Sequence, residues 1–277
     1  MILDNETSLL YLSDNIRSRA TFFAELSALL QSRKIQYHLL PNTRDIWAVD
    51  YMPVQVALDR FVQFRYQPDY LQSAKYITTQ TDPDEVCKDI GLDRIHSNII
   101  LDGGNIIKGK KWAILTDKVF KENPLVPQKK IVAQLEELFD VKVIVIPREP
   151  YDFTGHADGM LRYYDEETLL INDYGNHLSV SYRARLAKVL ASQGFKLITI
   201  PYAPNPSNLS SADGVYINFL EMKNFLLIPT FRNMADGKVV AIFEQLYPSS
   251  SIQTIDACDI SKDGGVLHCI SWPIATI

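Results

Sequence analysis

A single arrangement of elements recurs about every 50 to 56 residues along the chain, and a repeat of this length restricts the fold more than any other feature of the sequence. Each unit reads as an amphipathic helix, a short β-branched strand, a polar loop and two alternating segments typical of a β-hairpin. The fifth hairpin is cut short, and the N-terminal segment "SLLYL" is expected to supply its missing strand and close a ring. The helices are expected to begin near Asn15, Asp84, Pro127, Ser179 and Asp236.

The strands that follow the helices are short and apolar. Their sequences are "KIQYHLL", "RIHSNIIL", "VKVIVIP", "FKLITIP" and "SIQTIDA", and such runs are typical of buried strands. We therefore expect an α/β fold in which helices surround a closed ring of short mixed sheets. No linker, low-complexity stretch or break in composition divides the chain, so we expect one domain over residues 1–277.

Composition excludes several classes of function. The 277 residues are 47% hydrophobic, which is enough to bury a sizeable core. The net charge of -5 disfavours nucleic acid as a partner, because such binding relies on basic surface. We expect no membrane partner, since no apolar run approaches the roughly 20 residues of a spanning helix and the N-terminus does not resemble a signal peptide. Three cysteines give no disulfide framework, which indicates a soluble, cytoplasmic protein and leaves a homo-oligomer open.

The repeat places one aspartate at a corresponding point of each polar loop. If the units pack around an axis, these loops meet at one end, and a centre lined by the first four aspartates is strongly negative. Like charges in a buried pocket raise one another's pKa, so the cluster needs a cation, either a metal or a charged substrate. A guanidinium group fits because a carboxylate can accept two parallel hydrogen bonds from it. The five residues are Asp50, Asp102, Asp158, Asp213 and Asp263.

Two clusters carry residues for covalent chemistry. Cys269 follows a Gly-Gly turn in "GGVLHC", and His156 lies two residues before Asp158 in "GHADGML". A thiol beside a bound guanidinium is expected to ionise and attack its carbon, with His156 protonating the departing ammonia and then activating water. We expect neither a metal nor an organic cofactor, because no H-x-x-x-H or C-x-x-C spacing supports zinc.

Five blocks of sequence occur in order from about residue 43 to residue 270: "TRDIWAVDYMP", "LDGGNI", "GHADGMLRY", "YINF" and "GGVLHC". Together they resemble the family of agmatine deiminases and bacterial peptidylarginine deiminases. The resemblance implies the five-bladed, pseudo-symmetric α/β propeller (pentein) fold of guanidine-modifying enzymes. It also implies a hydrolase acting on the C–N bonds of a small guanidino substrate or of an arginine side chain in a peptide.

The resemblance implies a role for each matching residue. Cys269 is the nucleophile, His156 the acid and base, and Asp50 and Asp158 the carboxylates that bind the guanidinium group. Asn218 is expected to be structural. The substrate-binding set comprises Trp47 beside the substrate, the supporting loop Asp102, Gly104 and Asn105, and Asp213 from the aligned aspartates.

Departures from the family pattern concern the substrate tail. Val49 and Met52 replace the usual Arg and Gly around the first aspartate, and Asp102 replaces a Glu. Agmatine, free arginine, peptidyl arginine and other guanidino compounds therefore stay open. Free arginine needs a cation for its carboxylate, and the candidates are Arg44, Arg162 and Arg232.

Simpler interpretations stand beside these. Amidino transfer to an amine uses nearly the same residues, and a non-catalytic binding protein of the same fold is a third alternative. Cys269 by itself reads as a small buried hydrophobe, and Asp213 as an ordinary turn former. His268 is expected only to flank the nucleophile. The turn-rich segment "YAPNPSNLS" is expected to form a loop over the site.

Overall fold

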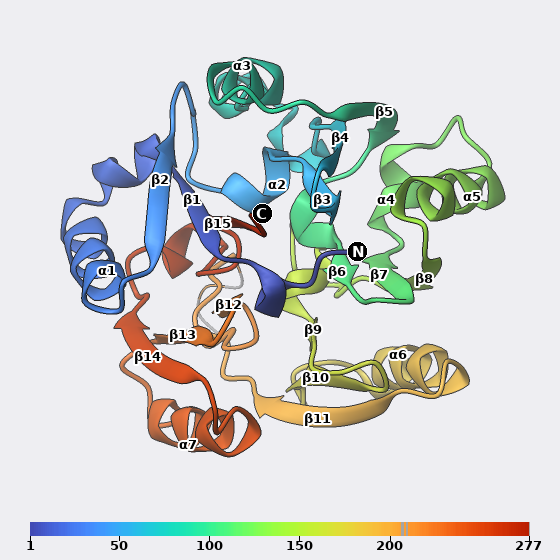
Figure 1. Cartoon of the computed structure of the whole chain (residues 1–277). Helices are drawn as coiled ribbons and strands as arrows, with labels where there is room; N and C mark the ends of the chain where they lie inside the picture. The colour runs from blue at the N-terminus through green and yellow to red at the C-terminus, as the bar shows by residue number, and fades with distance from the viewer. Residues whose placement is uncertain (206–207, 209, 277) are drawn as a thin grey trace.

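Five sheets of three strands surround a common centre in the computed structural model, counted over the residues it describes, which are 1–205, 208 and 210–276. Each sheet joins an antiparallel pair of strands to an outer strand that runs parallel to the middle one. Figure 1 shows the longer helices at the periphery and both ends of the chain near the centre. The predicted ring of mixed sheets with outer helices is confirmed.

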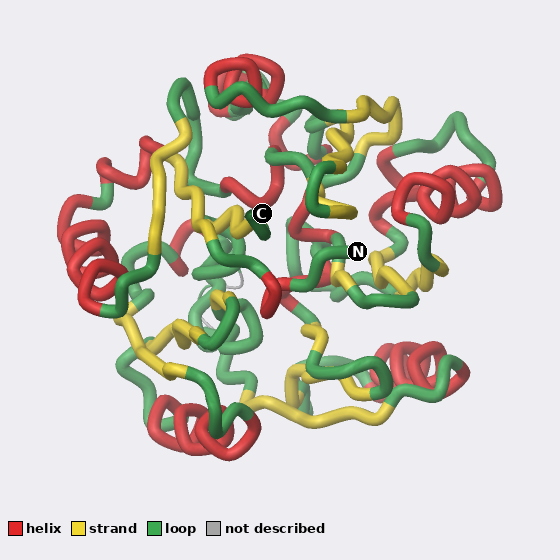
Figure 2. Tube along the Cα trace, in the orientation of Figure 1, coloured by secondary structure: helices red, strands yellow, loops and turns green. Residues whose placement is uncertain are grey.

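The strands follow the predicted repeat along the chain (Figure 2). Their bounds are β1 Leu9–Ser13, β2 Gln36–Leu40, β3 Val54–Ala57, β4 Arg60–Arg65, β5 Ile95–Ile100, β6 Ile107–Lys108, β7 Trp112–Thr116, β8 Lys142–Ile146, β9 Leu161–Tyr163, β10 Thr168–Asp173, β11 Lys196–Pro201, β12 Leu220–Met222, β13 Phe225–Thr230, β14 Ser251–Asp256 and β15 Ser271–Ile274.

The long helices begin within a few residues of the predicted positions. Ser179 caps its helix by accepting a hydrogen bond from the backbone N–H of Tyr182, which satisfies one of the free donors of the first turn. The α-helices are α1 Ala20–Ser32, α2 Ala48–Tyr51, α3 Pro83–Asp89, α4 Lys118–Glu122, α5 Gln128–Phe139, α6 Val180–Ser192 and α7 Asp236–Leu246. Single 3-10 turns are η1 Asp4–Glu6, η2 Asp14–Ser18, η3 Asp69–Leu71, η4 Ile77–Thr79, η5 Gly103–Asn105, η6 Ala157–Gly159 and η7 Ser261–Asp263.

The two ends of the chain close the ring. Strand β1 pairs antiparallel with β15, Leu9 facing Ile274, and parallel with β2, Leu9 facing Gln36. The predicted use of "SLLYL" as the missing strand is confirmed. β1 thus becomes the middle strand of this sheet and satisfies the backbone groups on one side of β15.

The expectation that the strands after the helices are buried is wrong for four of the five. Strands β2, β5, β11 and β14 lie at the outer edge of their sheets, where residues nearer their start reach solvent. Only a position near the inner end of each strand is fully buried: Leu40, Ile99, Ile200 and Ile255. Apolar composition does not distinguish an edge strand that a helix covers from a central strand.

Side chains between the sheets and the outer helices form the core. Helix α6 buries Tyr182, Leu186 and Leu190, which follow one another at intervals of four residues, and leaves its other face in water. None of the helices in the described part of the chain is long and apolar enough to span a bilayer.

Replacement of Leu10 by Ala tests the ring closure. Leu10 is fully buried in β1, so its truncation is expected to lower the free energy of unfolding by about 2–5 kcal/mol. Urea denaturation followed by circular dichroism measures the change. Leu125→Ala is the control, because this side chain is 96% exposed and its loss is expected to change the free energy by less than about 0.5 kcal/mol. Equal effects of the two variants would contradict the assigned role of β1.

Candidate active site

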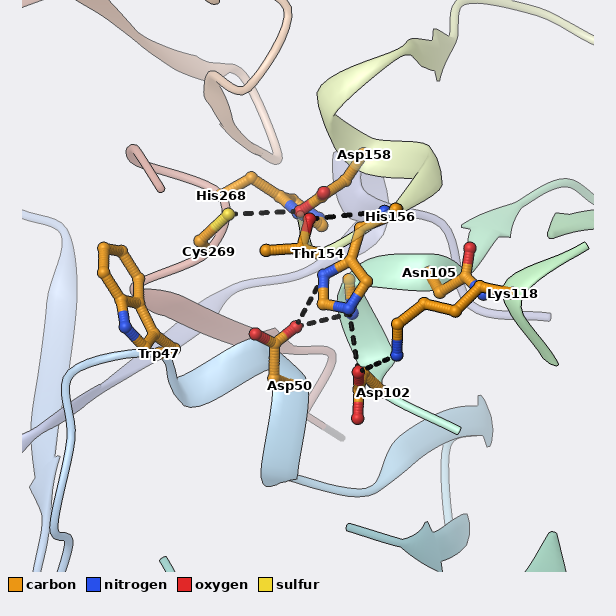
Figure 3. A network of polar contacts seen from close by, with 12 residues as sticks. Trp47, Asp50, Asp102, Asn105, Lys118, Thr154, His156, Asp158, His268 and Cys269 are labelled. Atoms are coloured by element: carbon orange, nitrogen blue, oxygen red, sulfur yellow. Dashed lines mark hydrogen bonds and ion pairs between the residues drawn. The ribbon is translucent and has the colours of Figure 1, made fainter. Parts of the chain in front are cut away.

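The polar loops of the repeat meet at one end of the ring and enclose a cavity of about 860 Å³. Its wall includes Trp47, Asp50, His156, Asp158 and Cys269, which come from three different units of the repeat. Figure 3 shows their side chains converging. The structure thus brings together the predicted nucleophile, histidine, paired carboxylates and tryptophan.

Asn218 holds the backbone of the cysteine loop. Cys269 lies in a turn just before β15, and the Asn218 Oδ1 atom accepts hydrogen bonds from the backbone N–H groups of His268, at 3.1 Å, and Cys269, at 3.3 Å. The amide of Asn218 donates to the carbonyl of Asp158 at 3.4 Å. This buried side chain therefore ties the cysteine loop to the histidine loop, in the structural role predicted for it.

Asp158 contacts both the nucleophile and a second histidine. Its Oδ2 atom lies 3.4 Å from Cys269 Sγ and 2.7 Å from His268 Nδ1. Burial acts to raise the pKa of Asp158, but the hydrogen bond with His268, together with the nearby positive groups of His268, His156 and Arg162, outweighs it and holds this pKa below its ordinary value. Sequence reasoning treated His268 as a mere neighbour of the cysteine, and it missed this contact because the two residues are 110 positions apart.

His268 in turn faces the N-terminal segment. Its Nε2 atom lies 3.6 Å from Asp4 Oδ2, and Asp4 also pairs with Arg162 and Lys108, at 2.6 Å each. Against the effect of burial, Lys108 and Arg162 hold the pKa of Asp4 well below its usual range. The sequence carries no signal for this support, because Asp4 lies outside the repeating units.

His156 is held between two carboxylates. Its Nε2 atom lies 2.8 Å from Asp102 Oδ2, and its Nδ1 atom lies 3.5 Å from Asp50 Oδ1. Burial alone would lower the pKa of His156, but Asp50 and Asp102 reverse that effect and raise it to about 9. The two carboxylates thus favour the protonated imidazole, which is the form that a general acid needs before it donates.

Asp102 supports the histidine from behind the cavity. It is fully buried and does not belong to the cavity wall. Its Oδ2 atom binds Lys118 Nζ at 2.8 Å as well as His156, and Lys118 also pairs with Glu122 one turn further along α4. Although burial opposes them, Lys118 and His156 together keep the pKa of Asp102 below its ordinary value. Lys118 was not among the residues selected from the sequence, because a lysine at the start of a short helix normally faces water.

Asp50 has His156 as its ion-pair partner, and the described residues place no lysine or arginine beside it. It lies in α2 and accepts a hydrogen bond from the Gly104 N–H at 3.0 Å. Burial, followed by the nearby charges of Asp102 and Asp158, raises its pKa to about 8 although His156 acts in the opposite sense. A cationic ligand at this point would restore the ionised form.

Gly104 is required at the back of the site. A Cβ atom there would lie 2.6 Å from Asp50 Oδ1 and 2.9 Å from His156 Nδ1, closer than real Cβ atoms approach other atoms. Any larger residue would push the histidine and the carboxylate apart. Gly104 thus serves through backbone approach rather than through contact with a ligand.

The surroundings of Cys269 favour the neutral thiol over the thiolate. Burial, together with the negative charges of Asp158 and Asp50, raises its pKa well above the ordinary value for cysteine. The same two carboxylates would attract a cation to the cavity. A positive group bound between them would lower the pKa of the thiol and couple ionisation of the nucleophile to ligand binding.

Aromatic rings form further parts of the wall. The ring of Trp47 packs so closely on Gly265 that a Cβ atom there would lie 2.4 Å from it. Tyr70 approaches the His156 ring edge-on, with centroids 6.1 Å apart, and Phe153 meets Tyr70 at 5.5 Å. Tyr70 and Phe153 were not predicted, because a single aromatic residue in a loop carries no periodic or motif signal.

Four residues expected in the substrate-binding set do not line the cavity: Asp102, Gly104, Asn105 and Asp213. The first two hold His156 and Asp50 as described. The Asn105 Oδ1 atom accepts a hydrogen bond from the Thr116 N–H at 3.0 Å and so ties η5 to the end of β7. Asp213 bonds to the hydroxyl of Ser261, and it is correspondingly not part of the negative centre. The repeat aligns the aspartate positions in sequence. The loops that carry them differ in length and path, so the side chains lie at different distances from the cavity.

The three candidate arginines lie in different parts of the structure. Arg44 lies in the cavity wall and donates to the carbonyl of Gln80 at 3.1 Å. Arg162 is buried on Asp4, and Arg232 pairs with Asp256 at the surface. Of the three, Arg44 alone can meet a ligand in this cavity.

The turn-rich segment "YAPNPSNLS" also contributes to the wall through Tyr202, Pro204 and Ser210. Residues 206, 207 and 209 of that predicted loop lie outside the described residues. Across the part of the chain that the structure describes, no group of three or more His, Cys, Asp or Glu side chains is arranged to hold a metal ion.

Comparison with known proteins identifies the family. Residues 2–274 match the Porphyromonas-type peptidyl-arginine deiminase family. The chain belongs to this family. A curated relative, the agmatine deiminase of Stutzerimonas stutzeri, is 25% identical over 207 residues, which cover 62% of this chain and 56% of the relative. The matches span 56% to 62% of the length of such relatives.

Solved structures share the fold over nearly the whole chain. The agmatine deiminase of C. jejuni superposes with a TM-score of 0.80 at 17% identity and covers 99% of this chain and 95% of its own. The enzyme named DDAH from Pseudomonas aeruginosa gives a TM-score of 0.59 at 12% identity, covering 97% and 99%. The five-bladed α/β propeller (pentein) expected from the sequence is confirmed.

The raised pKa of Cys269 predicts slow alkylation of this family member near neutral pH. Only the thiolate reacts with iodoacetamide, so the rate at Cys269 is expected to rise continuously with pH and to show no plateau below about pH 9. Peptide mass spectrometry separates Cys269 from Cys87 and Cys258, and Cys269→Ala is the blank. Rapid alkylation with a plateau near pH 7 would show that the thiol is already ionised in the empty site.

Proposed function

We propose that this protein hydrolyses a guanidino group, converting agmatine or an arginine derivative into a ureido product and ammonia through a covalent intermediate on cysteine. The observation that carries the proposal is the placement of Cys269, His156, Asp50 and Asp158 around one cavity. A neutral thiol, a protonated histidine and two buried carboxylates together suit a planar cation with an electrophilic carbon. We propose further that residues 1–277 act as one domain in the cytoplasm, which agrees with the three free thiols.

Binding is the first step of the proposed reaction. Asp50 and Asp158 accept hydrogen bonds from the guanidinium nitrogens, and the ring of Trp47 lies beside the planar group. The bound positive charge opposes the two negative charges that raise the pKa of Cys269. The thiol then loses its proton to solvent, so the nucleophile forms when a substrate is present.

Ammonia leaves in the first half of the reaction. The Cys269 thiolate attacks the guanidinium carbon and forms a neutral tetrahedral adduct with a new C–S bond. His156 donates its proton to one amino nitrogen, the C–N bond breaks and ammonia departs. A positively charged thiouronium group remains on the sulfur, and the imidazole is neutral.

Water completes the cycle. Neutral His156 takes a proton from water as its oxygen attacks the thiouronium carbon. The second tetrahedral adduct collapses to the ureido product, the C–S bond breaks, and the hydroxyl proton returns to the thiol. The proton first lost by Cys269 converts ammonia to ammonium, so all protons are accounted for.

For the part of the substrate beyond the guanidino group, we propose a set of candidate compounds. The cavity of about 860 Å³ is much larger than a guanidinium group, and both acidic and basic side chains line it. Glu149 is buried in the wall, while Arg44 offers a cation to a carboxylate. Agmatine, free arginine and an arginine side chain in a peptide are therefore the compounds to compare.

Substitution of the nucleophile tests the reaction. Cys269→Ala is expected to abolish release of ammonia and ureido product from every member of a panel of agmatine, arginine, an arginine peptide and methylated arginines. The matched control is Cys87→Ala, which removes another buried thiol that lies outside the cavity and is expected to keep turnover. Undiminished turnover by Cys269→Ala would refute the covalent mechanism, and product analysis with an added amine would reveal amidino transfer.

Replacement of Asp50 tests recognition of the cation. In the Cys269→Ala background, Asp50→Asn is expected to weaken substrate binding about tenfold to a hundredfold, because a charge-assisted hydrogen bond is worth about 1.5–3 kcal/mol. Isothermal calorimetry measures the dissociation constant. Asp213→Asn is the matched control, since it alters the corresponding aspartate of another unit outside the cavity wall. Equal affinity of the Asp50 and Asp213 variants would remove Asp50 from the binding site.

A further inference from the structure

A buried lysine stands behind the histidine of the site. The side chain of Lys118 is 2% exposed, although it is the first residue of the short helix α4. Burial of an ammonium group is costly unless hydrogen-bonding partners surround it. Lys118 meets that requirement with Asp102 and Glu122, and its Nζ atom also lies 5.3 Å from the centre of the Tyr70 ring.

One carboxylate oxygen connects Lys118 to His156. Asp102 Oδ2 lies 2.8 Å from Lys118 Nζ and 2.8 Å from His156 Nε2, and Asp102 Oδ1 has no hydrogen-bond partner in the structure's described residues. Both cations therefore draw on the same oxygen. How strongly Asp102 stabilises the protonated imidazole therefore depends on how much of its negative charge Lys118 neutralises.

The stem of Lys118 contacts the histidine loop as well. A Cβ atom built on Gly155 would lie 3.5 Å from Lys118 Cδ, so the lysine packs against the backbone that precedes His156. Thr116 fixes the same backbone by donating its hydroxyl hydrogen to the carbonyl of Gly155 at 2.6 Å. Substitution with a residue that keeps the stem can thus remove the charge without removing the packing.

In the proposed mechanism the imidazole of His156 acts first as an acid and then as a base. His156 has to give up a proton to ammonia and then take one from water, so neither form can be held too strongly. Asp50 and Asp158 on the other side of the ring both favour the charged form. An undivided charge on Asp102 would favour it further.

We propose that Lys118 is a positioning residue for the acid–base histidine, drawing part of the Asp102 charge away from His156 so that its proton can be released and regained within each cycle. The inference rests on the proposed deimination. This role goes beyond the neutralisation of buried carboxylates. Lys118 also pairs with Glu122, a carboxylate that does not contact the site.

The groups that face His156 determine the direction of the effect. They are Asp50 from α2, Asp102 before η5, Asp158 from its own turn, Lys118 from α4 and Tyr70 from η3. Burial acts to lower the pKa of His156, whereas Asp50 and Asp102 raise it and Lys118 lowers it. Removal of the lysine charge therefore raises the pKa of the histidine, and at neutral pH fewer molecules hold the neutral imidazole that activates water.

Lys118→Met is the test variant, because methionine keeps an unbranched stem and carries no charge. Nuclear magnetic resonance of the free protein follows the titration of the imidazole, assigned by its loss in His156→Asn. We expect the midpoint of the titration to move upward in Lys118→Met and to return toward wild type in Lys118→Arg. An unchanged or lower midpoint would overturn the proposal whether or not the protein turns over any guanidino compound.

Turnover gives a second readout. In Lys118→Met we expect kcat at pH 7 to fall about tenfold, with KM changed less than twofold and the covalent adduct on Cys269 accumulating in rapidly quenched samples. A purely structural lysine predicts less folded protein with unchanged kcat per folded molecule and no adduct. If wild type is inactive on the whole panel, the proposed deimination fails, while the titration still tests Lys118.

Two further variants guard against misfolding and nonspecific charge effects. Lys118→Met/Glu122→Gln removes the carboxylate left unpaired by the first substitution, and we expect it to restore stability yet keep the upward shift. Lys121→Met removes the neighbouring lysine of α4, which pairs with Asp69 at the surface at 2.6 Å, and we expect no shift. A shift of equal size in Lys121→Met would show that any lysine of this helix acts at a distance.

Discussion

Compensation of buried negative charge is the constraint on which the centre of this molecule depends. Carboxylates from several units converge at one end of the ring. Because they are buried away from water, each needs a cation or a protonated partner. Lys118 and His156 both pair with Asp102, and Lys108 and Arg162 both pair with Asp4. Asp50 and Asp158 face the cavity without a fixed lysine or arginine of their own, and there a ligand can supply the charge.

This unequal distribution links binding to reactivity. The carboxylates that we propose to bind a guanidinium also act, together with burial, to keep the thiol of Cys269 protonated. A bound cation would offset part of this negative charge and favour the thiolate. A site organised in this way would form its nucleophile when an electrophilic carbon is beside it, and it would discriminate against neutral compounds that cannot supply the charge.

The ring architecture allows such close approach of chain segments far apart in sequence. Loops that follow the outer strands turn toward one end of the ring, so residues from separate units meet in the cavity wall. Pairing of β1 with β15 completes the ring and fixes the cysteine loop beside the loop that carries Trp47. Where the loops touch, Gly104 admits the backbone within hydrogen-bond distance of Asp50.

Sequence by itself determined the repeat, the alternation of helices and hairpins, the closing strand and the motif residues Cys269, His156, Asp158 and Asp50, because hydrophobic period and local chemistry are written into neighbouring positions. Tertiary structure alone decided the rest. The contacts of Lys118, His268 and Asp4, the burial of Asp102 and the exclusion of Asp213 from the cavity depend on loop paths and on pairs separated by many residues. Those relations arise from packing around an axis, and no local pattern encodes how deeply each loop enters.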